Sequence, residues 1–322
     1  MSYGGTGGGA NRRGGSNYSQ STVQGSGYVR SLGGNIGVWG GDYDPAVDTQ
    51  DYIKIGVASN ARDFNELYVS RQSAAATTNG YRGVVGGGYG VVEPAGDTLQ
   101  DSIDFYTFSS FANGADFGNL TVAKDGAAAT SNGSKGIFGG GHSTAYGEGY
   151  EYVTISTLGN AVSFGQLWQW RAGLSGASDG ERSVWSAGTT PPANENTNVI
   201  EYVGMTTLGD ASDFGDLSFL NNRAGMTSDY NRGVTCAGHN ESAYVDSIDF
   251  YTIPTIGNAA DFGNLTQARG YTQSLSDGSR GITGSGSGPV DTMDFITIGS
   301  TGHAVDFAER EADLMIHGTS GD

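Results

Sequence analysis

The chain has 322 residues, 56 of them glycine, and its 34 acidic and 16 basic side chains give a net charge of −18. This charge argues against DNA, RNA or an anionic membrane surface as the main partner, because binding to phosphates depends largely on charge neutralisation. The single cysteine allows no intramolecular disulfide, and no spacing of cysteine and histidine fits a zinc site. We therefore expect neither a nucleic-acid partner nor a structural metal.

The N-terminal segment differs in composition from the rest of the chain. Residues 1–17 are rich in glycine and hold the adjacent Arg12 and Arg13 in an otherwise acidic protein. They lack the apolar segment of a secretory signal, and no apolar run in the chain approaches the ~20 residues of a membrane helix. A free segment of this composition is a flexible coil. We expect an arm that anchors residues 18–322 to a larger assembly, with no membrane insertion and no export by the standard route.

The pattern of apolar residues predicts an all-β chain. Apolar and polar residues alternate in short bursts, as in "DSIDFYTF" from Asp101 and "EYVTIS" from Glu151, and Gly, Asn, Ser and Asp separate the bursts. The chain has almost no apolar period of 3.6 residues and no long run of helix formers.

The motif Asp-Phe-Gly and its variants recur along the chain. The aromatic residue of the motif is found at Phe64, Phe117, Phe164, Phe214, Phe262 and Phe307. A second marker, a strand that closes on paired small residues, ends at Gly41, Gly88, Gly141, Gly188, Gly238 and Gly286. Both markers recur every 45 to 53 residues and both count six units. A period of this length indicates a repeat architecture.

Each unit is expected to hold four antiparallel strands, which we name a to d. In the fifth unit these are residues 223–229, 232–238, 246–253 and 261–267. Four short strands at a period near 50 residues are typical of a β-propeller blade. The predicted fold is therefore a six-bladed β-propeller. Its blades are residues 25–70, 71–123, 124–170, 171–220, 221–268 and 269–316.

The repeat resembles the kelch family of propellers, which have a double glycine closing strand b and an aromatic residue on strand c. The double glycine corresponds to Gly40-Gly41, Gly87-Gly88 and Gly140-Gly141, relaxed to Ala187-Gly188, Ala237-Gly238 and Ser285-Gly286. The strand c aromatics are Tyr52, Phe105, Tyr152, Tyr202, Phe250 and Phe295. The tryptophan typical of the kelch fourth strand is missing, and the Phe of Asp-Phe-Gly lies near its place. The resemblance implies a kelch-like propeller over residues 25–316.

Residues 248–269, "IDFYTIPTIGNAADFGNLTQAR", also resemble the repeat of tail and fibre proteins of bacteriophages, notably phages of marine bacteria including cyanophages. This resemblance implies a non-enzymatic structural protein of the virion, assembled in the host cytoplasm. Its implied partners are other virion proteins, in several copies in a symmetric assembly, and a host-surface glycan or protein. The alternative is a glycan-binding or glycan-processing propeller unrelated to virions.

The repeated residues have expected structural roles. The six motif Phe rings should be buried against the neighbouring blade, and the motif Gly should allow a close backbone approach. The motif Asp should accept backbone N–H groups in a turn.

Two sets of basic residues are also periodic. Arg71, Lys124, Arg171, Arg223 and Arg269 precede strand a, and Arg82, Lys135, Arg182, Arg232 and Arg280 open strand b. The second set is expected to pair with the motif Asp residues.

The loops between strands b and c do not repeat, and variable loops on a rigid frame are where recognition is usually found. Their aromatic, acidic and amide side chains suit contacts with sugars or proteins. The candidate binding residues are Tyr43, Asp44, Tyr89, Glu93, Tyr146, Glu148, Asn196, Glu241 and Tyr244. No Ser/His/Asp signature is visible, and Cys236 occupies a mostly small position of the repeat. We expect no catalytic residue, no metal and no cofactor.

Overall fold

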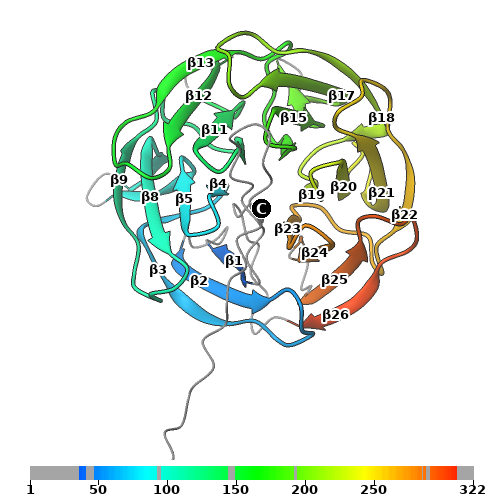
Figure 1. Ribbon diagram of the computed structural model, residues 1–322, viewed down its shortest axis with the longest axis horizontal. Helices are drawn as coiled ribbons and strands as arrows, with labels where there is room; N and C mark the ends of the chain where they lie inside the picture. Colours follow the sequence, from blue (N-terminus) through cyan, green and yellow to red (C-terminus); the bar gives the residue numbers. More distant parts are fainter. Residues whose placement is uncertain are drawn as a thin grey trace, which may run out of the picture.

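The computed structural model describes residues 36–40, 47–92, 96–143, 149–191, 194–284, 286–287 and 291–309. The predicted arm, including Arg12 and Arg13, lies outside these residues. Within them all regular structure is β-strand, and no helix there is long and apolar enough to cross a membrane. The sheets are arranged in a ring around a central axis, as Figure 1 shows. The prediction of an all-β, six-bladed β-propeller is confirmed.

Blades 2 to 6 each run from an inner strand a to an outer strand d. Blades 1 to 3 contain β1 (Ile36–Gly40), β2 (Val47–Lys54) and β3 (Arg62–Arg71); β4 (Ala75–Thr78), β5 (Arg82–Gly86), β8 (Ser102–Thr107) and β9 (Ala115–Asn119); and β10 (Ala128–Ser131), β11 (Lys135–Gly139), β12 (Gly149–Thr154) and β13 (Val162–Gln166). Blades 4 to 6 contain β14 (Ser175–Ser178), β15 (Arg182–Ser186), β17 (Glu195–Gly204) and β18 (Ser212–Asn221); β19 (Gly225–Ser228), β20 (Arg232–His239), β21 (Tyr244–Thr252) and β22 (Ala260–Asn264); and β23 (Gln273–Ser276), β24 (Arg280–Gly284), β25 (Thr292–Thr297) and β26 (Val305–Glu309).

Blade 1 has three strands among the described residues, which correspond to strands b, c and d. Two b–c loops add short pairings, β6 (Tyr89–Val92) with β7 (Gly96–Leu99) in blade 2, and β16 (Thr189–Thr190) with β17 in blade 4. The innermost strands of neighbouring blades contact one another around the axis, from β4 through β10, β14 and β19 to β23. The loops at the two ends of these strands therefore surround the axis on opposite faces.

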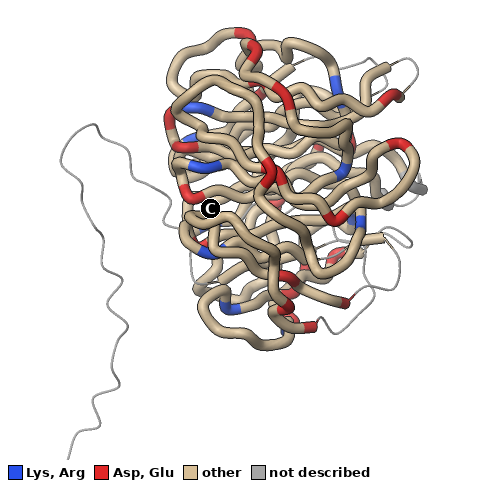
Figure 2. Tube along the Cα trace, turned by 90° about the vertical axis from the view of Figure 1, so that its right-hand side faces the viewer, with Lys and Arg blue, Asp and Glu red and all other residues tan. Residues whose placement is uncertain are grey.

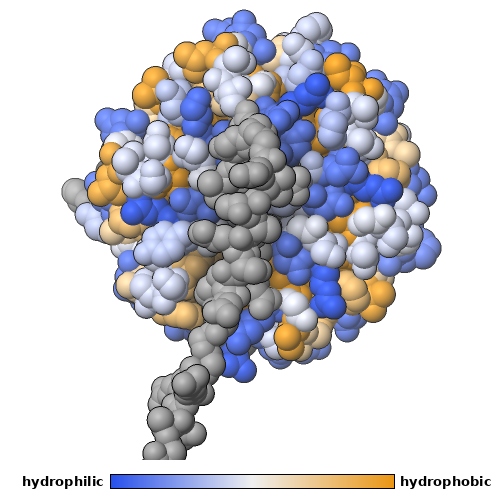
Figure 3. Space-filling model, viewed as in Figure 1, coloured by the Kyte–Doolittle hydropathy of each residue, from blue (hydrophilic) through white to orange (hydrophobic). Residues whose placement is uncertain are grey.

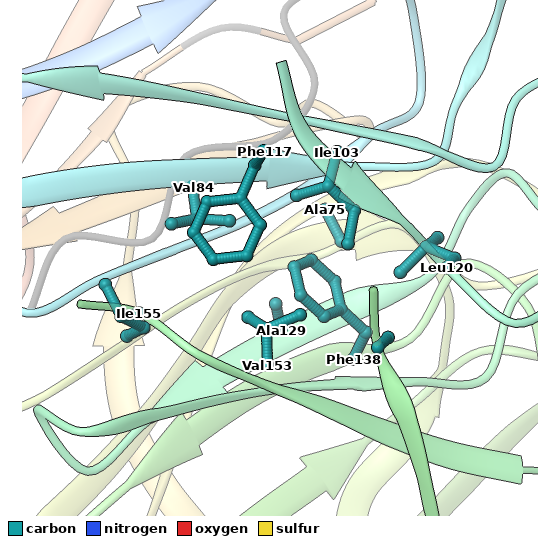
Figure 4. Packing of buried hydrophobic residues seen from close by; sticks show 10 residues of the cluster. Ala75, Val84, Ile103, Phe117, Leu120, Ala129, Phe138, Val153 and Ile155 are labelled. Atoms are coloured by element: carbon teal, nitrogen blue, oxygen red, sulfur yellow. The ribbon is translucent and has the colours of Figure 1, made fainter. Parts of the chain in front are cut away.

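The hydrophobic cores lie between blades. One core joins Phe117 and Ile103 of blade 2 to Phe138 and Ile155 of blade 3, as Figure 4 shows. All six motif Phe residues are buried, which confirms their predicted role. Burial of one such ring contributes roughly 1.5–3 kcal/mol, so the repeated Phe supplies much of the attraction between neighbouring blades.

The Asp-Phe-Gly motif forms the joint between each outer strand and the next blade. In blade 4 the pairing of β17 with β18 shifts at Phe214, which forms a β-bulge. The Phe214 carbonyl accepts the N–H of Gly257 of blade 5 at 2.9 Å, and a Cβ on Gly215 would lie 2.6 Å from the Gly257 oxygen. Gly118, Gly165 and Gly263 make the same approach to the next blade. The predicted close backbone approach is confirmed.

Two contacts of the same kind join the last blade to the first. The Ala61 N–H donates to the Glu309 carbonyl at 3.3 Å, and the Arg280 Nη1 donates to the Gly56 carbonyl at 3.2 Å. Glu309 belongs to β26, so the outer strand of blade 6 is the Asp-Phe-Ala segment of the last repeat. The ring therefore closes through contacts between residues far apart in the chain.

The predicted pairing of the strand b basic residues with the motif Asp residues is wrong. Within the described chain no ion pair joins the two sets, and the motif Asp side chains are exposed. Arg82 instead lies 4.4 Å from the centre of the Phe105 ring and donates to the Ile155 carbonyl of the next blade at 2.9 Å. The turn N–H groups bind other acceptors, as where Asn160 Oδ1 accepts the Asn119 N–H. A guanidinium on an aromatic face is stabilised by cation–π attraction and needs no carboxylate.

The other basic set forms the buried ion pairs of the fold. Arg71 pairs with Asp104 at 2.7 Å, and Lys124, Arg171 and Arg269 pair in the same way with Glu151, Glu201 and Asp294 on strand c of blades 3, 4 and 6. Each strand c carboxylate also accepts a backbone N–H from the preceding blade, as Asp104 does from Tyr68 at 2.9 Å. One buried carboxylate thus binds the strand d end of one blade and the joint that leads into the next.

Blade 5 lacks this cation, and the alignment of Arg223 with Arg71 is corrected. The structural equivalent is Asn221, whose Nδ2 donates to the Ala237 carbonyl at 2.8 Å just as Arg71 Nη1 donates to that of Gly87. Arg223 follows two residues later. The alignment of the double glycine in blade 1 is also corrected. Gly40 lies opposite Gln50 on strand c just as Gly86 lies opposite Ile103, so Gly40 is equivalent to Gly86. The double glycine of blade 1 therefore starts one position earlier in the repeat than Gly87-Gly88 of blade 2.

The face formed by the c–d turns exposes large apolar side chains in five consecutive blades. They are Val57, Phe111, Leu158, Leu208 and Ile256. On the face seen in Figure 3, apolar side chains gather in separate patches around the rim. Acidic residues lie toward both faces and along the edge, in keeping with the net charge of −18 (Figure 2).

Substitution of Gly215 by Ala tests the joint between blades. The added Cβ would lie 2.6 Å from the Gly257 oxygen at a backbone φ of +146°. We expect the free energy of unfolding to fall by ~2 kcal/mol, measured by chemical denaturation. Gly257→Ala is the matched control, because a Cβ there meets no atom within 4 Å. Equal stabilities of the two variants would contradict the close approach.

Asp249→Asn tests the missing cation of blade 5. Burial raises the pKa of Asp249, as does Asp261 opposite it. The folded state therefore holds the proton more tightly, so protonation favours folding as pH falls through the raised pKa. We expect Asn to increase the free energy of unfolding at pH 7 by ~1 kcal/mol, with the gain shrinking as pH falls.

The matched control for this variant is Asp104→Asn. It removes the anion that pairs with buried Arg71, and we expect it to lower the free energy of unfolding by ~3 kcal/mol. Urea denaturation of both variants at several pH values makes the comparison. A lower free energy of unfolding for Asp249→Asn at pH 7 would show that the negative charge of Asp249 does not destabilise the folded protein.

Candidate ligand-binding pocket

A pocket of about 870 Å³ opens on the face opposite the Asp-Phe-Gly joints. Its wall combines the joints that lead into strand a of blades 2 to 6 with the b–c loops of blades 3 to 5. Because five consecutive joints line it, the pocket surrounds the propeller axis. Its volume lies within the usual range of sites for small ligands.

The joints form an ordered wall through backbone hydrogen bonds. The N–H of Gly126 donates to the Ser73 carbonyl at 2.9 Å, that of Gly173 to Gly126 at 2.8 Å, and that of Arg223 to Gly173 at 2.8 Å. These residues share a left-handed backbone, with φ from 52° to 65°, and Tyr271 has the same conformation in blade 6. The ion pair or amide two residues earlier in each joint holds this turn in place.

The left-handed turn favours glycine, which occupies it in blades 3 and 4. Blades 5 and 6 instead place Arg223 and Tyr271 there, at a cost of about 1–2 kcal/mol for each side chain with a Cβ. The Arg223 guanidinium lies 4.2 Å from the centre of the Tyr271 ring. Strained backbone of this kind is typical of functional sites.

The b–c loop of blade 5 supplies the adjacent wall. Tyr244 is 41% exposed, and its ring meets that of His239 edge-on with the ring centres 5.4 Å apart. Glu241 is exposed at the rim and has a φ of 72°. The aromatic surface and the carboxylate therefore lie on the same side of the pocket as Arg223 and Tyr271.

A chain of amides connects blades 4 and 5 beneath this wall. Asn222 Nδ2 donates to Asn196 Oδ1, and Asn196 Nδ2 donates to the His239 carbonyl at 2.6 Å. The His239 carbonyl can only accept, so it determines the orientation of both amides. Asn222 is buried, and its Oδ1 has no hydrogen-bond partner among the described residues.

Asp125 and His142 form the titratable pair on the blade 3 side. Asp125 Oδ1 lies 3.5 Å from His142 Nδ1. Burial raises the pKa of Asp125, while His142 and Arg223 oppose that shift. No group of three His, Cys, Asp or Glu side chains within the described part of the chain is arranged to hold a metal ion.

Three of the predicted binding residues, Asn196, Glu241 and Tyr244, line this pocket together. Tyr89 does not line it and instead begins β6, where its backbone pairs with Gln72. The other predicted loop residues, Tyr43, Asp44, Glu93, Tyr146 and Glu148, lie outside the described residues. Cys236 is buried opposite Ile248 on strand b, and burial raises its pKa to about 11, as suits a packed and unreactive thiol.

Sequence reasoning missed Arg223, Tyr271, Asn222, Asp125 and His142 as site residues. The signal for the first two was present in the repeat. With Asn221 aligned to Arg71, Arg223 and Tyr271 fall where blades 3 and 4 have Gly126 and Gly173. A large side chain at a position that favours glycine indicates a role other than folding.

Comparisons with protein-family models and with curated proteins found no match to this chain. The pocket is therefore interpreted from its own geometry and chemistry.

Proposed function

We propose that this chain is a non-enzymatic recognition propeller of a bacteriophage virion, which binds a host-surface glycan in its axial pocket. The observation that carries the proposal is a contrast between the contacts that hold the blades together and the side chains that line the pocket. The blades repeat one set of contacts around the ring, whereas Arg223, Tyr271, Glu241 and Tyr244 depart from the repeat and gather on one side of the pocket. Such a concentration of non-repeated polar and aromatic side chains suits ligand binding.

The side chains around the pocket have the chemistry of a sugar-binding site. Amides, carboxylates and a guanidinium offer both donors and acceptors to hydroxyl groups. Tyr244 adds a partly exposed aromatic surface against which a sugar ring can pack. A ligand that carries many hydroxyls on a compact ring uses all of these groups together.

The virion assignment is supported by the resemblance of residues 248–269 to the repeats of phage tail and fibre proteins, with a kelch-like pattern over the propeller. In this proposal residues 1–17, with Arg12 and Arg13, attach the propeller to other virion proteins. The pocket face then points outward, and several copies in a symmetric virion strengthen weak single contacts with the host surface.

A glycan-processing propeller is the second candidate, and one observation favours it. Asp125 is a carboxyl group with a raised pKa in the same pocket as Glu195 and Glu241. Glycoside hydrolysis uses two carboxyl groups, one of them a general acid with a raised pKa, and this pocket supplies carboxyl groups that include one with a raised pKa. Release of reducing sugar from a bound glycan distinguishes this candidate from simple binding.

The pocket is tested by retention of the purified protein on a glycan array and on host cells. Arg223→Gly restores the residue found in blades 3 and 4, so we expect stability within about 1 kcal/mol of the parent and binding weaker by about tenfold or more. Tyr244→Ala is expected to weaken binding similarly. Leu208→Ser, an exposed change on the opposite face, is the matched control. Unchanged binding by both pocket variants would overturn the assignment.

The arm is tested by deletion of residues 2–17. We expect the deleted protein to bind glycans with the parental affinity and to be lost from purified virions, as measured by immunoblotting of virion preparations. We expect these two results together because glycan binding and attachment to the virion are proposed to depend on separate parts of the chain. Normal incorporation of the deleted protein would remove the arm from the proposal.

A further inference from the structure

We propose that the axial pocket selects an uncharged sugar and rejects its carboxylated counterpart, with Glu241 as the residue that enforces the choice. This inference rests on the proposed glycan-binding function and specifies the class of ligand. Its basis is the distribution of strain and of charge around the pocket.

Backbone strain is concentrated at this pocket. Nine non-glycine residues in the described part of the chain have a left-handed backbone, and five of them line the pocket: Ser73, Asn194, Arg223, Glu241 and Tyr271. Four of these five belong to the blade 4 to 6 side. At the joints the fold alone does not require Arg223 or Tyr271, because glycine serves at the joints of blades 3 and 4. The ligand subsite is therefore on the blade 4 to 6 side.

The cation of this subsite is already oriented by the protein. Arg223 is held over Tyr271, and its positive charge opposes the rise that burial causes in the pKa of Asp125. The guanidinium of Arg223 therefore interacts with both an aromatic ring and a carboxyl group of the protein. Planar N–H groups oriented in this way can donate to a pair of neighbouring hydroxyls.

Three carboxyl groups of the described chain share the pocket wall with this cation. Glu195 and Glu241 are exposed in the pocket wall, and neither forms an ion pair with any described residue. Asp125 belongs to the blade 3 joint of the same wall and lies beside His142. Carboxylate oxygens only accept hydrogen bonds, so they match hydroxyl donors and repel a ligand carboxylate. The net charge of −18 adds a long-range repulsion of the same sign.

The pocket groups thus favour a ligand that donates many hydrogen bonds and carries no negative charge. An uncharged hexose or N-acetylhexosamine unit satisfies both conditions. A uronic or sialic acid unit satisfies the first and violates the second, because the described pocket wall holds three carboxyl groups, Asp125, Glu195 and Glu241, against the one guanidinium of Arg223. Like charges brought together in a binding site weaken binding strongly.

The experiment measures affinities by calorimetry for saccharides in matched pairs, glucosides with glucuronides and asialo with sialylated oligosaccharides. We expect the carboxylated member to bind about tenfold more weakly or worse. In Glu241→Gln, we expect this preference to fall by about threefold or more, with the affinity for the uncharged member changed by less than about threefold. Gln keeps the size of the side chain and removes its charge, so the variant isolates the electrostatic effect.

The matched control is Glu181→Gln, which makes the same change of net charge at an exposed a–b turn on the opposite face. We expect it to leave the preference unchanged. Equal binding of charged and uncharged members by the parent protein would overturn this inference while leaving glycan binding intact. Absence of binding to every saccharide would instead overturn the proposed function. An unaltered preference in Glu241→Gln would remove Glu241 as the selecting residue.

Discussion

The buried carboxylate on strand c is the interaction on which the rest of the propeller depends. In blade 2 Asp104 accepts backbone N–H groups from Tyr68 and Val69 of blade 1, and it pairs with Arg71 at the joint between the two blades. Transfer of such a pair from water to the interior is costly, so its main contribution is to specify geometry. One carboxylate determines where the preceding blade ends and how the chain turns into the next inner strand.

The joints anchored in this way also form the wall of the pocket. Arg71 and its equivalents lie two residues before the left-handed turn that lines the pocket wall. In the joints that lead into blades 2, 4 and 5, their guanidinium or amide groups bind the carbonyl of the first paired small residue of the blade that follows. The second small residue approaches the joint closely, since a Cβ on Gly188 would lie 2.9 Å from the Ala172 oxygen. The wall is thus rigid, and its side chains can vary without changing the frame.

The two faces of the propeller consequently differ in kind. The Asp-Phe-Gly face is occupied by contacts between blades, which leave little freedom for substitution at the motif Phe and Gly. The pocket face is assembled from positions where the backbone is fixed and the side chain is free. Blades 5 and 6 place large polar and aromatic residues at those positions, and blades 3 and 4 keep glycine. The asymmetry of the pocket therefore arises from the chain's departures from its own repeat.

The sequence by itself determined the number of blades, the four strands of each blade, and the burial of the motif Phe residues. These features follow from local alternation and from a period that recurs six times, so each unit supports the reading of the others. The tertiary structure alone decided the partners of the charged residues. Arg82 could have faced the motif Asp, yet it lies on Phe105 and binds a carbonyl 73 residues away. It also showed that Asn221, and not Arg223, takes the place of Arg71, because Asn221 makes the equivalent hydrogen bond to the Ala237 carbonyl. The pocket could not be read from the sequence for the same reason: its residues come from five joints that are distant in the chain and become neighbours only when the ring closes.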